Sequence, residues 1–379
     1  MIPVCAPLLG EEEIQNVMKA LKNNQISGTF GEYIDEFEKK FSEYCGCKYG
    51  VATTSGTTAL HLALASLDIK RGDEVILSTL TNIATAYAVV YCNATPVTVD
   101  SEPVTWNIDP RKIEQKITEN TKVILPVHIY GHPCNMELIV KIARKYNLYV
   151  VEDAAEAHGA EYFSKENRKW QKVGAIGDIG CFSFYSNKII TTGEGGMIVT
   201  NNKEICEKAK LLRNLAFSKN VRFKHDYLGF NYRMTNLQAA IGGAQVDRID
   251  EIIDKKRYIA KCYSEGLASV EGITLPVEME WAKNVYWMYS ILVEREFALS
   301  RDELIEKLRE KGVETRTFFI PMNKQPVFQK MGLFKDERCP VAEELSQKGL
   351  YLPSGVGLKE EEIDYVINTI REISQKRDR

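Results

Sequence analysis

The stretch GDIGCFSFYSNKIITTGEGG, residues 177–196, contains the features that decide the fold. The apolar, aromatic run at 181–185 has the length and composition of a buried strand. Lys188 follows alone, and the glycine-rich segment 193–196 leads into a second apolar run at 197–200. Most loop lysines are solvated. A lysine held between two buried strands can instead lose its solvent, which lowers its pKa and lets the neutral amine attack an aldehyde to form a Schiff base.

Short apolar runs and amphipathic segments alternate on both sides of this stretch. They predict strands at 49–53, 74–77, 95–100, 123–129 and 148–151, and helices at 11–24, 33–44, 57–69, 84–90, 111–117, 138–146 and 203–215. Such alternation favours an α/β fold with a mainly parallel sheet covered on both faces. Ligands of such sheets gather beyond the carboxyl ends of the strands, where Asp153 and Lys188 both lie. The polar segment 162–172 predicts a solvated hairpin.

The pattern changes after residue 230. An apolar stripe predicts one long helix from about 235 to 264, of the kind that bridges two domains. Beyond it we expect strands at 285–293 and 313–320, helices at 301–311, 341–348 and 359–376, and a loop at 321–331. A chain of 379 residues is long enough for two domains. We therefore predict a large α/β domain over residues 1–250 and a smaller C-terminal α+β domain over residues 251–379.

The composition excludes several classes of function. A net charge of −3 gives no reason to expect a nucleic-acid partner or a membrane surface. The nine cysteines form no CxxC pair, which indicates reduced core thiols and neither a disulfide framework nor a zinc site. No secretory leader and no apolar run of about 18 residues is present. We expect a cytoplasmic protein.

A possible anion site follows the first predicted strand. Residues 54–58, TSGTT, join that strand to the next helix, so free backbone amides and the positive end of the helix dipole would face whatever lies in the turn Ser55-Gly56-Thr57. Ordinary N-capping by a serine or threonine explains the same residues equally well.

Three features together suggest one cofactor. Pyridoxal phosphate (PLP) needs a lysine, a phosphate cradle and a carboxylate that keeps its pyridine nitrogen protonated. Lys188, the turn at 55–57 and Asp153 match these needs. Asp153 could instead be a helix cap or a metal ligand. A metal site requires clustered ligands, and the histidines near strand ends (128, 132 and 158) form no such motif, so we expect no metal.

Longer motifs point to a family. They are SGTTALHLAL at 55–64, PVHIYGHPCNM at 126–136, EDAAEAHGA at 152–160, the opening stretch, GFNYRMTNLQAAIG at 229–242 and RTFFIPMNKQPVF at 316–328. With these motifs in this order the chain resembles the DegT/DnrJ/EryC1/StrS nucleotide-sugar aminotransferases, PLP enzymes of the aspartate-aminotransferase fold type I. Within that family the sequences at 152–162 and 182–196 most resemble those of the GDP-perosamine synthases.

The resemblance implies an activity and its partners. The enzyme would move an amino group from L-glutamate to a nucleotide-linked 4-keto-6-deoxyhexose, giving a 4-amino-4,6-dideoxy sugar. PLP would alternate with pyridoxamine 5'-phosphate (PMP). The enzyme would be a homodimer with shared active sites.

The resemblance also implies roles for individual residues. Lys188 would bind the cofactor covalently and carry protons, and Asp153 would pair with the ring nitrogen. Glu156 would contact the ring hydroxyl, where many relatives have glutamine. The phosphate would be held by Ser55, Gly56, Thr57, Ser183 and, from the neighbouring subunit, Asn231.

Four further residues have more than one interpretation. Asn82 stands where the family usually has an aromatic that stacks on the ring, and an amide plane offers less apolar area. Ser27, Arg233 and Arg316 are candidate donors to the diphosphate or the sugar, or equally structural hydrogen-bonders. Nucleotide choice would depend on loops such as 24–30, 217–227 and 318–328.

Alternative functions differ in substrate or in chemistry. A UDP- or dTDP-4-keto-6-deoxyglucose 4-aminotransferase would need the same residues. A sugar dehydratase of this fold typically has histidine in place of the lysine, so Lys188 argues against it. A non-catalytic binding protein is the third alternative, and no helix-turn-helix or basic tail supports it.

Overall fold

The opening stretch forms two adjacent strands of a seven-stranded sheet, β8 (Ile179–Ser183) and β9 (Gly196–Thr200), with Lys188 on the connection between them. The computed structural model of the chain describes residues 1–218, 221 and 223–375. The sheet order is β1-β9-β8-β5-β4-β2-β3. The other strands are β1 (Tyr49–Thr53), β2 (Glu74–Ser78), β3 (Thr95–Val99), β4 (Thr121–Leu125) and β5 (Tyr149–Asp153). Only β9 runs against its neighbours, so the predicted mainly parallel sheet is confirmed.

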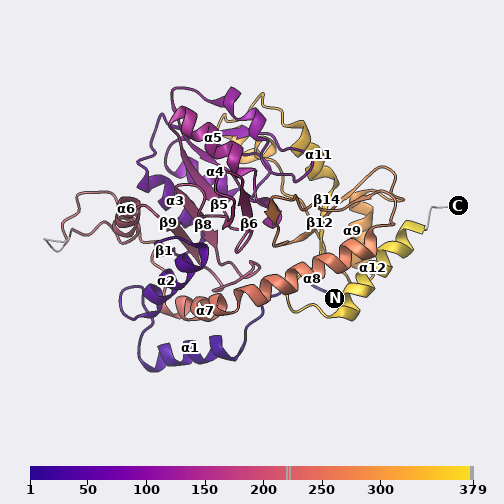
Figure 1. Cartoon of the computed structure of the whole chain (residues 1–379), viewed down its shortest axis with the longest axis horizontal. Coiled ribbons are helices and arrows are strands. Elements are labelled where there is room, and N and C mark those ends of the chain that lie inside the picture. The colour runs from indigo at the N-terminus through magenta and orange to yellow at the C-terminus, as the bar shows by residue number, and fades with distance from the viewer. Residues whose placement is uncertain (219–220, 222, 376–379) are drawn as a thin grey trace.

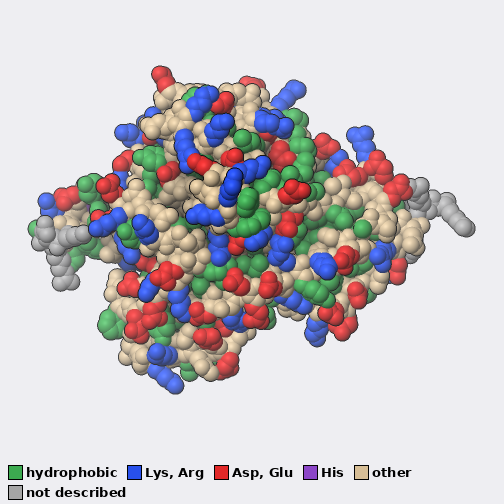
Figure 2. Space-filling view, viewed as in Figure 1, with side chains coloured by type: hydrophobic (Ala, Val, Ile, Leu, Met, Phe, Trp, Pro, Cys, Tyr) green, Lys and Arg blue, Asp and Glu red, His purple; other side chains and the backbone are tan. Residues whose placement is uncertain are grey.

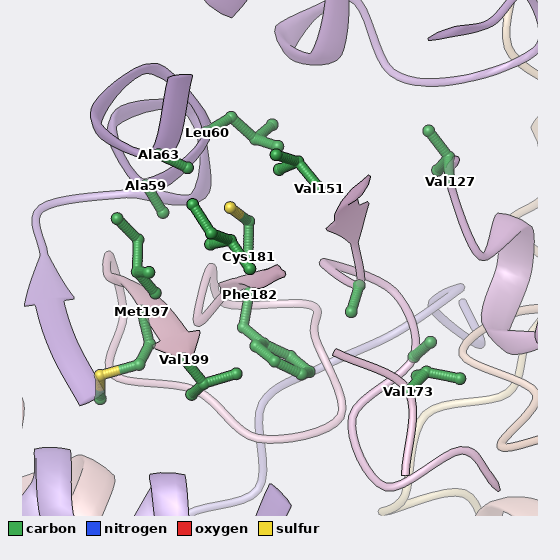
Figure 3. Packing of buried hydrophobic residues seen from close by; sticks show 14 of the residues in the cluster. Ala59, Leu60, Ala63, Val127, Val151, Val173, Cys181, Phe182, Met197 and Val199 are labelled. Atoms are coloured by element: carbon green, nitrogen blue, oxygen red, sulfur yellow. The ribbon is translucent and has the colours of Figure 1, made fainter. Parts of the chain in front are cut away.

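Seven helices accompany this sheet (Figure 1). They are α1 (Glu11–Lys22), α2 (Tyr33–Cys45), α3 (Gly56–Ser66), α4 (Ala84–Tyr91), α5 (Met136–Tyr146), α6 (Lys203–Arg213) and α7 (Asn236–Asp247). Figure 3 shows Ala59 and Ala63 of α3 over one side of the sheet, while Phe182 and Val199 point to the other. There Phe182 meets Phe41 of α2 edge-on, with ring centroids 4.9 Å apart. Both faces of β8 are therefore covered by apolar side chains. This packing holds the carboxyl end of β8, and the segment with Lys188 begins there.

The predicted long helix is broken into two. α7 ends at Asp247 and α8 spans Ile249–Leu267, because Arg248 leaves the helical conformation at φ −109° and ψ 4°. Side chains at the break are held by other helices, since Asp247 pairs with Lys40 of α2 and Arg248 with Glu13 of α1. The prediction of one unbroken helix was therefore wrong. α8 still leads from the large sheet to the C-terminal elements, as Figure 1 shows.

A second sheet of four antiparallel strands lies beyond α8. Its order is β10 (Ile273–Thr274), β12 (Tyr289–Val293), β14 (Gly349–Leu352) and β13 (Arg316–Thr317). It accompanies α9 (Arg301–Glu310), α11 (Pro340–Lys348) and α12 (Glu360–Gln375). Residues of α8, β12, α9, β14 and α12 share an apolar core separate from that of the large sheet. This agrees with a smaller α+β unit, although the division between residues 250 and 251 stays a prediction.

The predicted hairpin at 162–172 is confirmed as β6 (Glu161–Ser164) and β7 (Lys169–Lys172), and β11 (Ala282–Lys283) joins it in a third sheet. Other predicted boundaries were wrong. The helix expected at 111–117 is two single 3-10 turns, η1 (Pro110–Lys112) and η2 (Glu114–Lys116), since so short a segment gains little as an α-helix. The strand expected at 123–129 ends at Leu125, and the one at 285–293 begins at Tyr289.

The segment after β13 also differs from expectation. Of the strand predicted at 313–320, only Arg316–Thr317 forms β13 beside β14, while Val313 bridges Ile2. The Phe319 amide donates to the Tyr130 hydroxyl and not to β14. The predicted loop at 321–331 contains η4 (Met322–Lys324) and α10 (Pro326–Lys330), and β14 was not predicted at all.

Surface and composition features complete the description. All nine cysteines are free thiols, and seven are buried, as expected for reduced core residues. Charged side chains of both signs are interspersed over the face in Figure 2. Among the described residues, no helix is both long and apolar enough to cross a bilayer. Within the same residues, no cluster of three or more His, Cys, Asp and Glu side chains has the arrangement of a metal site.

Candidate active site

A cavity of about 590 Å³ opens beyond the carboxyl ends of β1, β5 and β8. The first turns of α3 and α4 and the segments around β12, β13 and β14 form its other walls. It gathers most of the predicted site residues: Ser55, Gly56, Thr57, Asn82, Asp153, Glu156, Ser183, Lys188 and Arg316. These come from distant parts of the sequence, so the fold assembles one chemical site.

Lys188 lies in this cavity with almost no solvent around its amine. Its amide donates to the Tyr185 carbonyl at 2.9 Å, which closes a turn after β8. The side chain is 11% exposed, and Nζ lies 3.8 Å from Glu156 Oε1 and 3.8 Å from the centre of the Trp287 ring. Burial lowers the pKa of Lys188, while Glu156, Asp153 and Cys5 raise it. The amine is thus made more nucleophilic, as the sequence argument required.

Asp153 ends β5 as a buried carboxylate with defined donors. Its Oδ2 accepts from the Thr85 hydroxyl at 2.8 Å and its Oδ1 from the Ala155 amide at 3.2 Å. Burial raises the pKa of Asp153, whereas these hydrogen bonds and the charge of Lys188 lower it. A cation that met this carboxylate in the cavity would stabilise its charged form further.

The carboxylate of Glu156 accepts a hydrogen bond from the main chain at Oε2 and lies beside Lys188 at Oε1. Oε2 accepts from the Tyr130 amide at 2.9 Å, and Oε1 faces Lys188. Tyr130 has a left-handed backbone, with φ 53°, which few non-glycine residues adopt. Burial raises the pKa of Glu156 to about 7, against the opposing effects of Lys188 and the Tyr130 amide.

This raised pKa predicts a pH dependence of stability in the cofactor-free protein. A carboxyl that binds its proton more tightly when folded favours folding most at low pH, and this contribution is lost as pH rises from about 4.5 to about 7. Glu156→Gln removes the titrating group. We expect the Tm difference between variant and wild type to increase in the variant's favour over that range and to stay constant above it. Parallel Tm curves from pH 4.5 to 8 would contradict the assignment.

The predicted anion site is the N-terminus of α3. Ser55 is its N-cap, and its hydroxyl accepts from the Thr58 amide at 3.2 Å, so the capping interpretation is correct for that hydroxyl. Gly56, Thr57 and Ser183 line the same cavity. A Cβ on Gly56 would lie 2.7 Å from the Cβ of Ser183, so glycine lets the end of β8 approach the helix. The capping uses the Ser55 hydroxyl and leaves the amides of Gly56 and Thr57 as the donors that anion binding would need.

Gly56→Ala tests this cradle. The added methyl forces α3 and Ser183 apart and disturbs both sources of hydrogen-bond donors, so we expect PLP affinity to fall by about tenfold or more, the loss of one charge-assisted bond. Fluorescence titration of the cofactor-free protein measures it. Gly357→Ala is the control, since nothing lies within 4 Å of a Cβ there. Equal affinities in the two variants would count against the cradle.

Asn82 lines the cavity, but its side chain also serves the backbone. Its Oδ1 accepts from the Ala84 amide at 3.0 Å at the start of α4. The stacking role suggested for this position stays a prediction.

Three predicted residues lie outside the cavity. Ser27 is exposed and its carbonyl accepts from Asn236, while Arg233 donates to Asn214 Oδ1 at 2.7 Å. Asn231 is exposed and pairs with Asn214 in an isolated bridge. None of the three lines this chain's cavity, so a role in an active site would involve the cavity of a second subunit. The loop predicted at 217–227 lies partly outside the described residues, which omit 219, 220 and 222.

Several residues of the cavity were not predicted. Thr85 supports Asp153, and three aromatic side chains, Trp287, Phe319 and Tyr351, form the wall that the C-terminal elements contribute. Phe319 belongs to the motif at 316–328 and Trp287 to the predicted strand at 285–293, but neither was assigned to the site. No motif or predicted strand covers Thr85 or Tyr351.

The residues of the cavity fit PLP. The cofactor needs three functions, and the cavity offers a group for each: a buried lysine amine, a buried carboxylate and a helix N-terminus. Gly56 at that N-terminus lets Ser183 approach closely. Lys188 would form the covalent link, Asp153 would meet the ring nitrogen, Glu156 would meet the ring hydroxyl, and the turn at 55–57 with Ser183 would hold the phosphate. Their relative placement leaves no competing donor set for a metal among the described residues.

Comparisons with known proteins agree with this chemistry. Residues 7–371 match the model of the DegT/DnrJ/EryC1/StrS aminotransferase family. The chain is 43% identical to the GDP-perosamine synthase of Caulobacter vibrioides over 98% of both chains. It resembles the solved aminotransferase of Psychrobacter cryohalolentis with 33% identity and a TM-score of 0.91, covering 97% and 98% of the two chains. A Streptococcus pneumoniae protein solved in PLP and PMP forms is 26–27% identical, with a TM-score of 0.92 and at least 98% of each chain covered. The chain therefore belongs to the DegT/DnrJ/EryC1/StrS aminotransferase family, whose enzymes use PLP.

Proposed function

We propose that this protein transfers the amino group of L-glutamate to C4 of GDP-4-keto-6-deoxymannose, which makes it a GDP-perosamine synthase. The observation that carries the chemistry is the shared cavity of Lys188, Asp153 and the α3 N-terminus. The choice of nucleotide sugar is supported by the 43% identity to a protein of that name over nearly the whole chain.

Each residue has a defined task in this transfer. The bound cofactor supplies an aldehyde that links to amines and a ring that accepts an electron pair. In the first half-reaction the free amine of Lys188 would take the proton from the donor's α carbon and pass it to the cofactor, and in the second it would move a proton from the cofactor to C4 of the sugar. Glu156 Oε1, 3.8 Å from Nζ, would stabilise the ammonium that forms within each of these transfers. Asp153 would keep a proton on the ring nitrogen, because its buried carboxylate favours a cation beside it.

A substrate panel tests the proposal. The enzyme is offered L-glutamate with GDP-4-keto-6-deoxymannose, UDP-4-keto-6-deoxyglucose or dTDP-4-keto-6-deoxyglucose, and products are identified by mass spectrometry. We expect an amino sugar from the GDP substrate. An amino sugar only from the UDP or dTDP substrate would move the specificity, and loss of a hydroxyl without gain of nitrogen would indicate a dehydratase.

We also propose a homodimer with shared active sites. Asn231 is exposed and remote from this chain's own cavity, and exposed apolar side chains lie near it in sequence or beside Lys188, including Tyr227, Leu228 and Tyr185. Mixing Lys188→Ala with Asn231→Ala subunits tests sharing, because a mixed dimer would contain one site with both wild-type residues. Activity that does not recover after subunit exchange would argue against it.

A further inference from the structure

We propose that Trp287 is a positioning residue for Lys188: its indole supports the amine when the lysine is free, and its N–H anchors the chain that carries the lysine. This inference deepens the proposed aminotransferase function and rests on it. No sequence motif assigned Trp287 to the site. Two contacts of its indole, one with Lys188 and one with the Asn187 carbonyl, support the role.

The indole touches both the reacting amine and the backbone before it. Lys188 Nζ lies 3.8 Å from the ring centroid, within the range of a cation–π contact. The indole Nε1–H donates to the Asn187 carbonyl at 2.7 Å. The Trp287 side chain thus contacts Lys188 at its amine and holds the backbone of the residue before it.

The backbone of Trp287 is held by neighbouring residues. Its carbonyl accepts from Nζ of Lys256, a buried lysine of α8, at 2.7 Å, and the same Nζ also donates to the Ser354 carbonyl. The preceding residue, Tyr286, has φ 47°, and its amide donates to Asn284 Oδ1 at 2.7 Å. A Cβ on Gly131 would lie 2.9 Å from the Trp287 amide nitrogen, so the two backbones are packed against each other. The ring is 4% exposed and has little freedom to move.

The chemistry explains why such support is useful. When the free amine of Lys188 takes up a proton it becomes a buried cation, and Glu156, Asp153 and Cys5 are the ionisable groups that raise its pKa. His158, on the other side, is kept neutral by burial, which lowers its pKa to about 3. The carboxylates alone would draw the amine to their side of the cavity. The indole face offers a second attraction that contains no hydrogen-bond acceptor, and it would keep Nζ from moving wholly to the carboxylates.

Two substitutions separate the two contacts. Trp287→Phe keeps an aromatic face and loses the N–H donor, whereas Trp287→Leu loses both. Trp281→Phe is the matched control, because Trp281 packs on His132 and Tyr162 away from the cavity. Thermal unfolding of each variant verifies that it folds.

The first measurement uses the cofactor-free protein. Competitive labelling of Lys188 with an amine reagent over a pH series, read by peptide mass spectrometry, gives the pKa of its amine. We expect that pKa to fall by about half a unit to one unit in Trp287→Leu, by less in Trp287→Phe, and not at all in Trp281→Phe. An unchanged or higher pKa in Trp287→Leu would overturn the role of the indole face.

The second measurement uses the glutamate half-reaction of the loaded enzyme. Trp287→Phe should slow it about threefold to tenfold with the KM for glutamate unchanged. The isotope effect with α-deuterated glutamate should rise, because proton transfer becomes more rate-limiting. An isotope effect equal to that of the wild type would overturn the anchoring role. If glutamate fails as a donor in the wild type as well, the proposed function fails, while the labelling result still decides the contact with Lys188.

Discussion

Lys188→Ala is expected to slow amino transfer by about 10³-fold or more, because general acid–base catalysis alone contributes about 10²–10⁴-fold and the covalent link is lost with it. The amine it removes is the one that lies 3.8 Å from Glu156 in the cavity. Borohydride reduction of the wild-type holoenzyme should attach the cofactor irreversibly to the peptide containing residue 188. The same treatment of the variant should leave no covalent adduct. Rates are measured in single turnovers, and the adduct by peptide mass spectrometry.

Lys256 provides the matched control for this experiment. It is the second buried lysine beside the site, and it lines a small hollow together with Lys188 and Trp287. Burial lowers its pKa to about 8, so it too is a reactive amine by environment. Lys256→Met should nevertheless keep the reduced adduct on residue 188. An adduct that persists in Lys188→Ala and disappears in Lys256→Met would transfer the covalent role to the other lysine.

The sequence predicted the chemistry of this site better than its walls. Lys188, Asp153 and the turn at 55–57 follow strands whose apolar runs are unmistakable, and parallel strands place their carboxyl ends at one edge. That geometry brings the three together without knowledge of any side-chain contact. The aromatic wall depends instead on how the C-terminal sheet packs against the large one. Such packing is set by contacts between residues far apart in sequence, such as Lys256 with the carbonyls of Trp287 and Ser354.

The errors at element ends have the same origin. The apolar periodicity runs through Arg248 without a break, but ion pairs to α1 and α2 end one helix and begin the next. The apolar pattern at 313–320 does contain a strand, β13, but the Phe319 amide donates to the Tyr130 hydroxyl and not to a neighbouring strand. Ser55 is a different case, because the sequence could not rank capping against anion binding at this turn and the structure shows the capping.

Asp153→Asn is expected to lower the rate of amino transfer by about 10²–10³-fold, the usual loss when a fixed electrostatic partner of the reacting system is removed. The amide keeps the shape of the carboxylate. Its single oxygen can still accept from the Ala155 amide while its NH2 donates to the Thr85 hydroxyl. It loses the negative charge that would hold a proton on the cofactor nitrogen. Cofactor binding should weaken far less than catalysis, and the visible absorption of the bound cofactor should lose its dependence on that protonation. Titration and single-turnover kinetics measure the two effects separately.

Thr85→Val tests the same charge more gently. Burial raises the pKa of Asp153, and the Thr85 hydroxyl at 2.8 Å is the first of the groups that counter it. Without that donor the pKa rises further, so the acid limb of the pH–rate profile should move to higher pH and the loss of activity should be greatest at low pH. Valine preserves the volume of the buried side chain, so the fold should tolerate it. A rate lowered equally at all pH values would mean that Thr85 supports the structure of α4 and not the charge of Asp153, and that the carboxylate relies on the Ala155 amide and Lys188 alone.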